Sequence, residues 1–124
     1  ELHDHLSQVG ADLLIATLKE IKAKGIDSLR KPQDHTKARY CSKITNAMAQ
    51  IDWNQTPLQI HNHIRGLSPF PGAFTIKDGL RVKVLRSTLQ NDQLKLLEVQ
   101  PAGKSAMMYE AYLRGGYPAL FSSS

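Results

Sequence analysis

The stretch from residue 56 to residue 75 constrains the fold more than any other part of this chain. Thr56 can accept a hydrogen bond from a free backbone N–H, Pro57 suits the first helical position, and Gln59 can close a capping box. Gly66 suits a left-handed helix stop, and a Pro-Gly pair follows it. The sequence therefore predicts a capped helix that ends at Gly66, then a turn that leads into a strand.

The predicted helix has two distinct faces. Ile60 and Ile64 lie four residues apart and share an apolar face, whereas His61 and Arg65 share another face, where they can pair. On this pattern alone, the simplest interpretation is a connector helix whose polar face lies in water.

Three strands are predicted after the turn. Ala73–Ile76 and Leu80–Ser87 form a hairpin across an Asp-Gly turn, and Leu94–Val99 forms a further strand. In the second arm, apolar residues at 80, 82 and 84 alternate with cations at 81 and 83. The cations are expected on the outer face together with Ser87, and Leu85 is an exception to the alternation.

One long and one short helix are predicted at the two ends of the chain. Residues 2–24 place apolar side chains at spacings of three and four, and Gly25 can end this helix. The short helix is expected over Ser105–Arg114, with Ser105 as its cap and Gly115 as its stop. The stripe of the long helix consists of Leu2, Leu6, Val9, Leu13, Leu14, Thr17, Leu18 and Ile21. The expected core residues of the short helix are Met107, Met108, Tyr112 and Leu113.

The composition indicates a globular protein with one modest core. Of the 124 residues, 41% are hydrophobic and 22% are charged, which is an ordinary globular balance. No apolar run approaches the roughly 20 residues of a membrane helix, and the first residues lack the pattern of a signal peptide. The single cysteine, Cys41, excludes an internal disulfide and is expected to be a small buried residue in a reducing compartment. We therefore expect a cytoplasmic monomer with no membrane association.

Positive charge is concentrated in one segment of the chain. The net charge is +5, and residues 22–43 hold seven basic residues against two acidic ones. Such a segment attracts polyanions, including nucleic acid, although it is also compatible with a solvated linker. The seven basic residues are Lys22, Lys24, Arg30, Lys31, Lys37, Arg39 and Lys43.

Residues 26–38 are predicted to be a basic linker, followed by a short strand near Arg39–Ile44. Two interpretations of this region stay open. Its cations and Tyr40 form a surface for phosphates and a stacked base, or Tyr40 and Ile44 pack into the domain while the cations face water. Trp53 is expected to be a core residue. The candidate phosphate contacts, chosen by charge and placement, are Lys37, Arg39, Lys43, Arg65, Arg81 and Lys83.

Four ordered blocks of the sequence resemble one known family. They read GADLLIATLKEI (10–21), KPQDHTKARYCSKIT (31–45), IHNHIRGLSPFPGAFT (60–75) and LLEVQPAGKSAMMYEAYLRG (96–115). In this order, and with IDW at 51–53, they are similar to the C-terminal region of methionyl-tRNA formyltransferases.

The resemblance implies a mainly β fold with short helices, namely an OB-like β-barrel preceded by an amphipathic helix and a basic linker. Residues 1–25 would be the last helix of an absent N-terminal catalytic domain, 26–38 the linker, and 39–124 the C-terminal tRNA-binding domain.

The resemblance also implies the reaction. The family transfers a formyl group from 10-formyltetrahydrofolate, its co-substrate, to the amino group of methionyl initiator tRNA in translation initiation. Its catalytic residues and folate site belong to the N-terminal domain, so no residue here is assigned a catalytic role. The chain is expected to be inactive alone, with initiator methionyl-tRNA and the catalytic domain as its partners.

The chain departs from the family between residues 88 and 94. Family members carry a longer segment with another strand pair there, whereas Thr88–Gln93 joins the two strands directly. Either residues are missing from the sequence, which we expect, or the barrel is truncated.

The same residues are compatible with other classes of function. A sugar-nucleotide formyltransferase of the same superfamily and a stand-alone RNA-binding module are the alternatives. His3 with His5, and His61 with His63, suggest metal ligands, but residues two apart on a helix face different directions. No cysteine pair completes a site, so we expect no metal.

Overall fold

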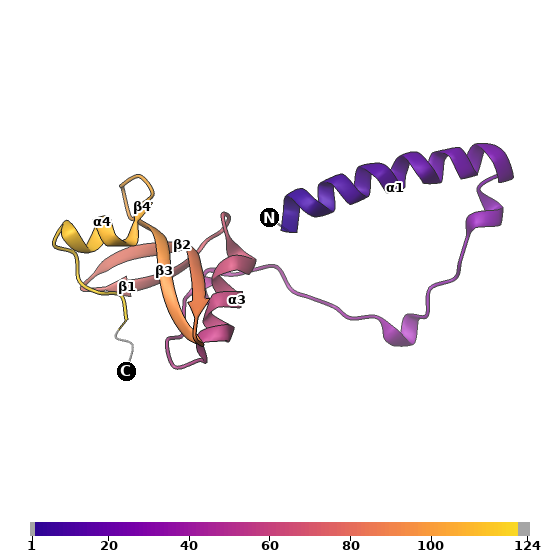
Figure 1. Cartoon of the computed structure of the whole chain (residues 1–124). Helices are drawn as coiled ribbons and strands as arrows, with labels where there is room; N and C mark the ends of the chain where they lie inside the picture. The colour runs from indigo at the N-terminus through magenta and orange to yellow at the C-terminus, as the bar shows by residue number, and fades with distance from the viewer. Residues whose placement is uncertain (1, 122–124) are drawn as a thin grey trace. The chain divides into compact units, whose positions relative to one another are not determined.

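The computed structural model describes residues 2–121, and the chain divides into two compact units. The first unit spans residues 1–41 and the second spans residues 42–124. Helix α1 of the first unit and the sheet of the second are labelled in Figure 1.

The long helix forms as predicted. Helix α1 spans Leu2–Lys24, and Gly25 ends it with a φ of 79° while its N–H donates to the Ile21 carbonyl at 2.8 Å. Two short 3-10 turns follow, η1 (Asp27–Leu29) and η2 (His35–Lys37). No described side chain of α1 is buried, so its apolar stripe is in contact with solvent.

The prediction of a short strand near Arg39–Ile44 is wrong. Residues 38–45 have no regular structure, and the next element is helix α2 (Asn46–Ala49), which the Thr45 hydroxyl caps. A strand needs a partner for its backbone, and the bridge to β1 is made instead by Gln50, which lies beside Phe74. Consequently Cys41 is exposed rather than buried.

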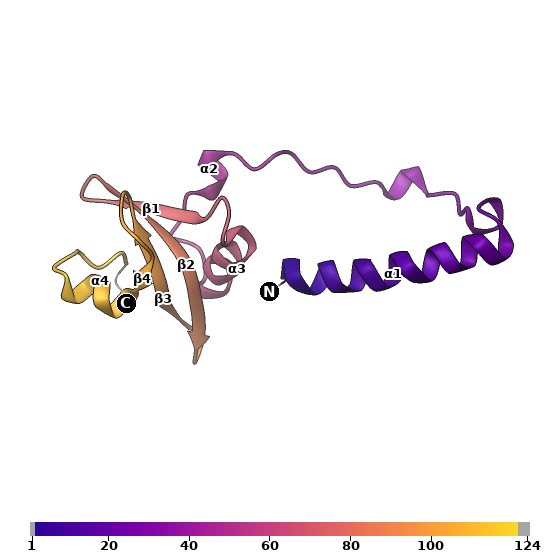
Figure 2. The same ribbon diagram turned by 90° about the horizontal axis from the view of Figure 1, so that it is seen from above.

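The second unit contains a four-stranded antiparallel sheet in the order β1-β2-β3-β4. Figure 2 shows α3 and α4 at opposite ends of this sheet. The strands are β1 (Ala73–Lys77), β2 (Leu80–Gln90), β3 (Gln93–Pro101) and β4 (Met107–Met108). The predicted hairpin is confirmed, and both residues of its turn, Asp78 and Gly79, have positive φ, as a type I′ turn requires.

A second tight hairpin joins β2 to β3. Its turn residues Asn91 and Asp92 have φ of 50° and 59°, and the ladder continues to the pair Gln90–Gln93. The β2–β3 ladder therefore reaches this turn without interruption. The sheet is not closed within residues 2–121, so the OB-like barrel implied by the resemblance is not confirmed.

An irregularity in the β2–β3 ladder changes which residues face the core. The pairing shifts between Val84 and Arg86, and again between Arg86 and Ser87. Ser87 therefore points toward α3, where its hydroxyl lies 2.9 Å from Nδ1 of His61. The prediction that Ser87 shares the outer face with the cations is wrong, because a bulge breaks the two-residue alternation.

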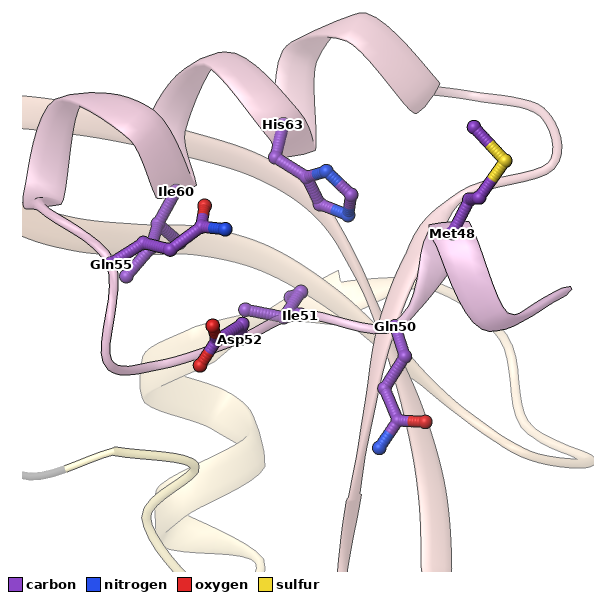
Figure 3. A pocket seen from close by; sticks show the side chains of 7 residues that line it. All are labelled: Met48, Gln50, Ile51, Asp52, Gln55, Ile60 and His63. Carbon is purple, nitrogen blue, oxygen red and sulfur yellow. The ribbon is translucent and has the colours of Figure 1, made fainter. Parts of the chain in front are cut away.

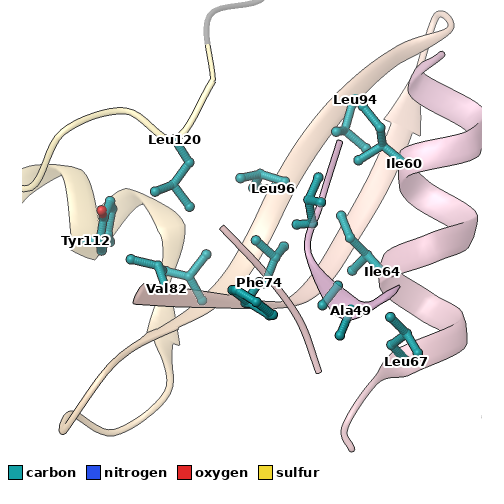
Figure 4. Close-up of a cluster of buried hydrophobic side chains, with 14 residues drawn as sticks. Ala49, Ile60, Ile64, Leu67, Phe74, Val82, Leu94, Leu96, Tyr112 and Leu120 are labelled. Carbon is teal, nitrogen blue, oxygen red and sulfur yellow. The ribbon is translucent and has the colours of Figure 1, made fainter. Parts of the chain in front are cut away.

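The core lies between the sheet and helix α3 (Pro57–Leu67). Figure 4 shows Ile60, Ile64 and Leu67 directed from this helix toward the strands, with Tyr112 and Leu120 at the other end of the cluster. Each of the three α3 residues is at most 8% exposed, so the helix contributes a continuous apolar face. The shared face predicted for Ile60 and Ile64 is confirmed.

Trp53 lies at the edge of this core. Its ring stacks on Phe121 with centroids 5.1 Å apart, and its Nε1–H donates to the Thr75 hydroxyl at 3.0 Å. Buried tryptophan needs such a polar partner. Trp53 is therefore a packing residue, as expected from the sequence.

The final helix is shorter than predicted. Helix α4 spans Tyr109–Arg114, and β4 occupies the preceding residues because they pair with β3. Of the four expected core side chains, Tyr112 is fully buried and Met107 packs against the core. The other two, Met108 and Leu113, are exposed.

Helix α3 begins as predicted but ends differently. Gly66 lies inside the helix, and the chain turns extended at Ser68, because the following proline disfavours helical backbone there. The predicted pair between His61 and Arg65 does not form. Arg65 Nε donates instead to the Asn62 side chain at 2.9 Å.

The capping box of α3 yields a first testable prediction. The Gln59 N–H donates to the Thr56 hydroxyl at 3.3 Å, and the Thr56 N–H donates to the Gln59 side chain at 3.0 Å. Thr56→Ala removes the acceptor, so we expect the free energy of unfolding to fall by about 1 kcal/mol. Denaturant titration followed by Trp53 fluorescence measures this change. Thr56→Ser keeps the hydroxyl and should remain close to the wild type, and an equal loss in both variants would contradict the capping role.

Candidate nucleic-acid interface

Two of the six candidate phosphate contacts lie in the first unit. Lys37 ends the turn η2, and Arg39 lies in the irregular segment after it, both exposed. The Nζ of Lys37 is 3.5 Å from Asp34, whose pKa is lowered by hydrogen bonds from the Thr36 hydroxyl and backbone N–H. An exposed ion pair of this kind is weak, so Lys37 can exchange Asp34 for a phosphate at little cost.

The other four candidates lie in the second unit. Lys43 is exposed before α2, and Arg65 is exposed in the last turn of α3. Arg81 and Lys83 lie on β2, where their apolar neighbour Val82 is fully buried. The alternation that predicted both cations on the outer face is confirmed for this half of the strand.

Arg81 and Lys83 form the best-defined cationic pair of the sheet. They line one shallow depression together with Gln100 and residues 101–103. The Arg81 guanidinium carbon lies 3.7 Å from the centroid of the Phe74 ring, a cation–π contact that fixes the group while leaving it charged. This arrangement can hold a phosphate group, since a planar guanidinium and a lysine converge on the same side of the sheet.

Two further cations were missed by the sequence analysis. Arg86 and Lys95 are exposed on the solvent side of β2 and β3, beyond the bulge. Lys95 follows from the alternation of β3, since Leu94 and Leu96 on either side of it are buried. The outward position of Arg86 could not be predicted in this way. It results from the register shift, and the residue pattern does not reveal the bulge that causes the shift.

A pocket of about 130 Å³ lies between α3 and the segment that precedes it. Figure 3 shows the His63 ring entering this space above Ile51, with Gln55 beside Asp52 at one side. The Nε2 of His63 is buried and has no hydrogen-bond partner among the described residues. The pocket has room for ordered water, which would satisfy this nitrogen.

The paired histidines point to different environments. His61 is bound to Ser87 and His63 lines the pocket, so the two rings do not share a site. Within residues 2–121, no three histidine, cysteine, aspartate or glutamate side chains gather in a way that could hold a metal ion. No helix in the described part of the chain has the length and apolar character to cross a membrane.

Part of the second unit matches a known family model. Residues 43–94 match the family model described as "Formyl transferase, C-terminal domain". This match covers α3, the first hairpin and the start of β3, which carry most of the buried core.

The relatives are more specific. A methionyl-tRNA formyltransferase of Methylobacterium sp. (strain 4-46) is 38% identical over 138 residues, which cover 93% of this chain and 44% of the relative. That of Heliobacterium modesticaldum is 37% identical over 106 residues, 86% of this chain and 32% of the relative. The resemblance to the C-terminal region of methionyl-tRNA formyltransferases is therefore confirmed. The chain spans less than half the length of these relatives.

The two alignments also bear on the direct connection between β2 and β3. The Methylobacterium alignment is longer than the 124 residues of this chain, so that relative carries additional residues within the aligned stretch. The Heliobacterium alignment has 106 positions and covers 86% of the chain, which leaves no room for additional residues. The Heliobacterium relative therefore aligns with this chain without additional residues, whereas the Methylobacterium relative does not.

Proposed function

We propose that this chain is the tRNA-binding C-terminal part of a methionyl-tRNA formyltransferase. The observation that carries the proposal is similarity to enzymes of that name over 93% of the chain. The exposed cations of the second unit support it, because sequence-independent contacts with phosphates require such a surface.

The proposed reaction transfers a formyl group from 10-formyltetrahydrofolate to the amino group of methionyl initiator tRNA. The chemistry and the folate site belong to residues outside this chain, which is inactive alone. This chain holds the tRNA so that its aminoacylated end reaches that site, a contribution of positioning rather than of chemistry. The proposed phosphate contacts are Lys37, Arg39, Lys43, Arg65, Arg81 and Lys83.

We assign residues 1–25 to the end of the catalytic domain, 26–38 to a basic linker and 39–124 to an OB-like tRNA-binding domain. The assignment of α1 is supported by its exposed apolar stripe, since a contiguous patch of this kind marks an interaction surface. We expect the catalytic domain to cover this stripe, so that the whole protein is a monomer. A reducing cytoplasm is the compartment in which the exposed thiol of Cys41 stays free. Exposed large side chains of α1 are Leu2, Leu6, Val9, Leu13, Leu14, Ile15 and Leu18.

The proposal is tested by binding of the full chain to initiator tRNA over a series of salt concentrations. We expect a straight line of log affinity against log salt with a slope of about −2.7 or steeper, which corresponds to roughly three or more neutralised phosphates. Absence of binding at low salt would show that the charge only keeps the chain in solution. That outcome would favour the sugar-nucleotide formyltransferase alternative.

A further inference from the structure

We propose that Phe70 stacks on an unpaired base of the bound RNA, and that Lys83 and Arg81 contact the adjoining phosphates. The proposal rests on the proposed function and adds to it a single-stranded feature of the RNA that this chain recognises. Phe70 is 86% exposed, the largest exposed fraction of any large apolar side chain among residues 42–121.

The loop that carries Phe70 is fixed at both ends. Leu67 before it and Ala73 after it are buried in the core, and the Gly72 N–H donates to the Leu67 carbonyl at 2.9 Å. Pro69 and Pro71 flank the aromatic residue and restrict its backbone. A ring presented in this way loses little conformational entropy when a planar partner covers it.

Cations lie next to this ring. Lys83 is paired with Phe74 in the β1–β2 ladder, and its Cδ would be 3.1 Å from a Cβ placed on Gly72. The aliphatic part of the Lys83 side chain therefore crosses the loop at Gly72. Gly72 is two residues after Phe70, so their Cα atoms are at most about 8 Å apart. Arg81 follows on the same outer face, stacked on Phe74.

An aromatic ring beside two cations matches the chemistry of a single-stranded nucleotide. Each base offers a flat π-face and each phosphate a negative charge, and proteins that bind single strands combine the same two contacts. A paired duplex offers phosphates but no free base face, so Phe70 would contribute nothing to binding it. A purely apolar protein partner would leave Lys83 and Arg81 without counter-charges.

The test compares Phe70→Ala with the wild-type full chain, using initiator tRNA and a fully paired RNA duplex as probes. Stacking of one base is worth about 1–3 kcal/mol, so we expect tRNA affinity to fall between about 5- and 150-fold. The slope of log affinity against log salt should not change, because no phosphate contact is removed. Binding to the duplex should also be unaffected. Because Phe70 is exposed, its truncation removes no buried core contact, and Trp53 fluorescence verifies the fold.

Matched variants separate stacking from other causes. Phe70→Tyr keeps the ring and should restore affinity, whereas Phe70→Leu keeps only apolar area and should not. Leu58→Ala removes an exposed apolar side chain of α3 that is not among the proposed contacts and should leave binding unchanged. If Phe70→Ala binds tRNA as the wild type does, or Phe70→Leu restores binding, the stacking inference is wrong while the proposed function stands. If the wild-type chain does not bind tRNA at low salt, both are wrong.

Discussion

Replacing Ile64 with alanine is expected to lower the free energy of unfolding of the second unit by about 3 kcal/mol. Ile64 is fully buried at the centre of the face that α3 presents to the sheet (Figure 4). Truncation removes apolar area from the core and leaves a cavity that helix and strands cannot both close. Small domains are stable by only about 5–15 kcal/mol, so this loss is a large fraction of the total.

Equilibrium denaturation followed by Trp53 fluorescence measures this effect, since Trp53 stacks on Phe121 in the folded unit. Leu58→Ala is the matched control, because Leu58 lies on the same helix but is 56% exposed. We expect the control to change stability by less than about 0.5 kcal/mol. Similar losses in the two variants would mean that α3 is not packed on the sheet in the way the structure shows.

The second large effect is expected from removing the paired cations of β2. With Arg81→Gln and Lys83→Gln combined, loss of two phosphate contacts should reduce the salt slope by about 1.8 and the affinity at 0.1 M salt by roughly 60-fold. Discrimination between RNA sequences should change little, because phosphate contacts carry no base information. The measurement is the same salt series of tRNA binding.

The matched control for this variant is Lys22→Gln combined with Lys24→Gln, which removes the same charge from the last turn of α1. If net charge alone attracted the tRNA, both double variants would lose affinity equally. A much larger loss in the β2 variant supports a localised binding face. Equal losses would argue against the assignment of Arg81 and Lys83.

Several features of the fold follow from short-range rules and were therefore predictable. The capping box at Thr56, the left-handed stop at Gly25 and the hairpin turn at 78–79 each depend on residues that are neighbours in sequence. The long helix was also visible from its spacing of apolar residues. Its lack of a covering partner among the described residues agrees with a chain that spans only part of its relatives.

The candidate binding face was predictable only in part. Strand alternation identified Arg81 and Lys83, because β2 is regular up to Val84. Beyond the bulge the alternation fails, so Ser87 turns toward α3 and Arg86 toward solvent. The exposure of Phe70 could not be predicted either, because the same turn sequence is compatible with a buried and with an exposed phenylalanine.

The sequence by itself determined the long helix, the capped start of α3, the hairpin turn at 78–79 and the resemblance to a family. Each of these is encoded in local conformational preferences or in letters that can be compared directly. Tertiary structure decided the remainder. It determined the bulge in β2, the start of α4 after β4, the irregular path of residues 38–45 and the open sheet. These features depend on which strand finds a hydrogen-bonding partner and which side chains share a core. Such choices are made between residues far apart in the chain, where short-range propensity has no influence.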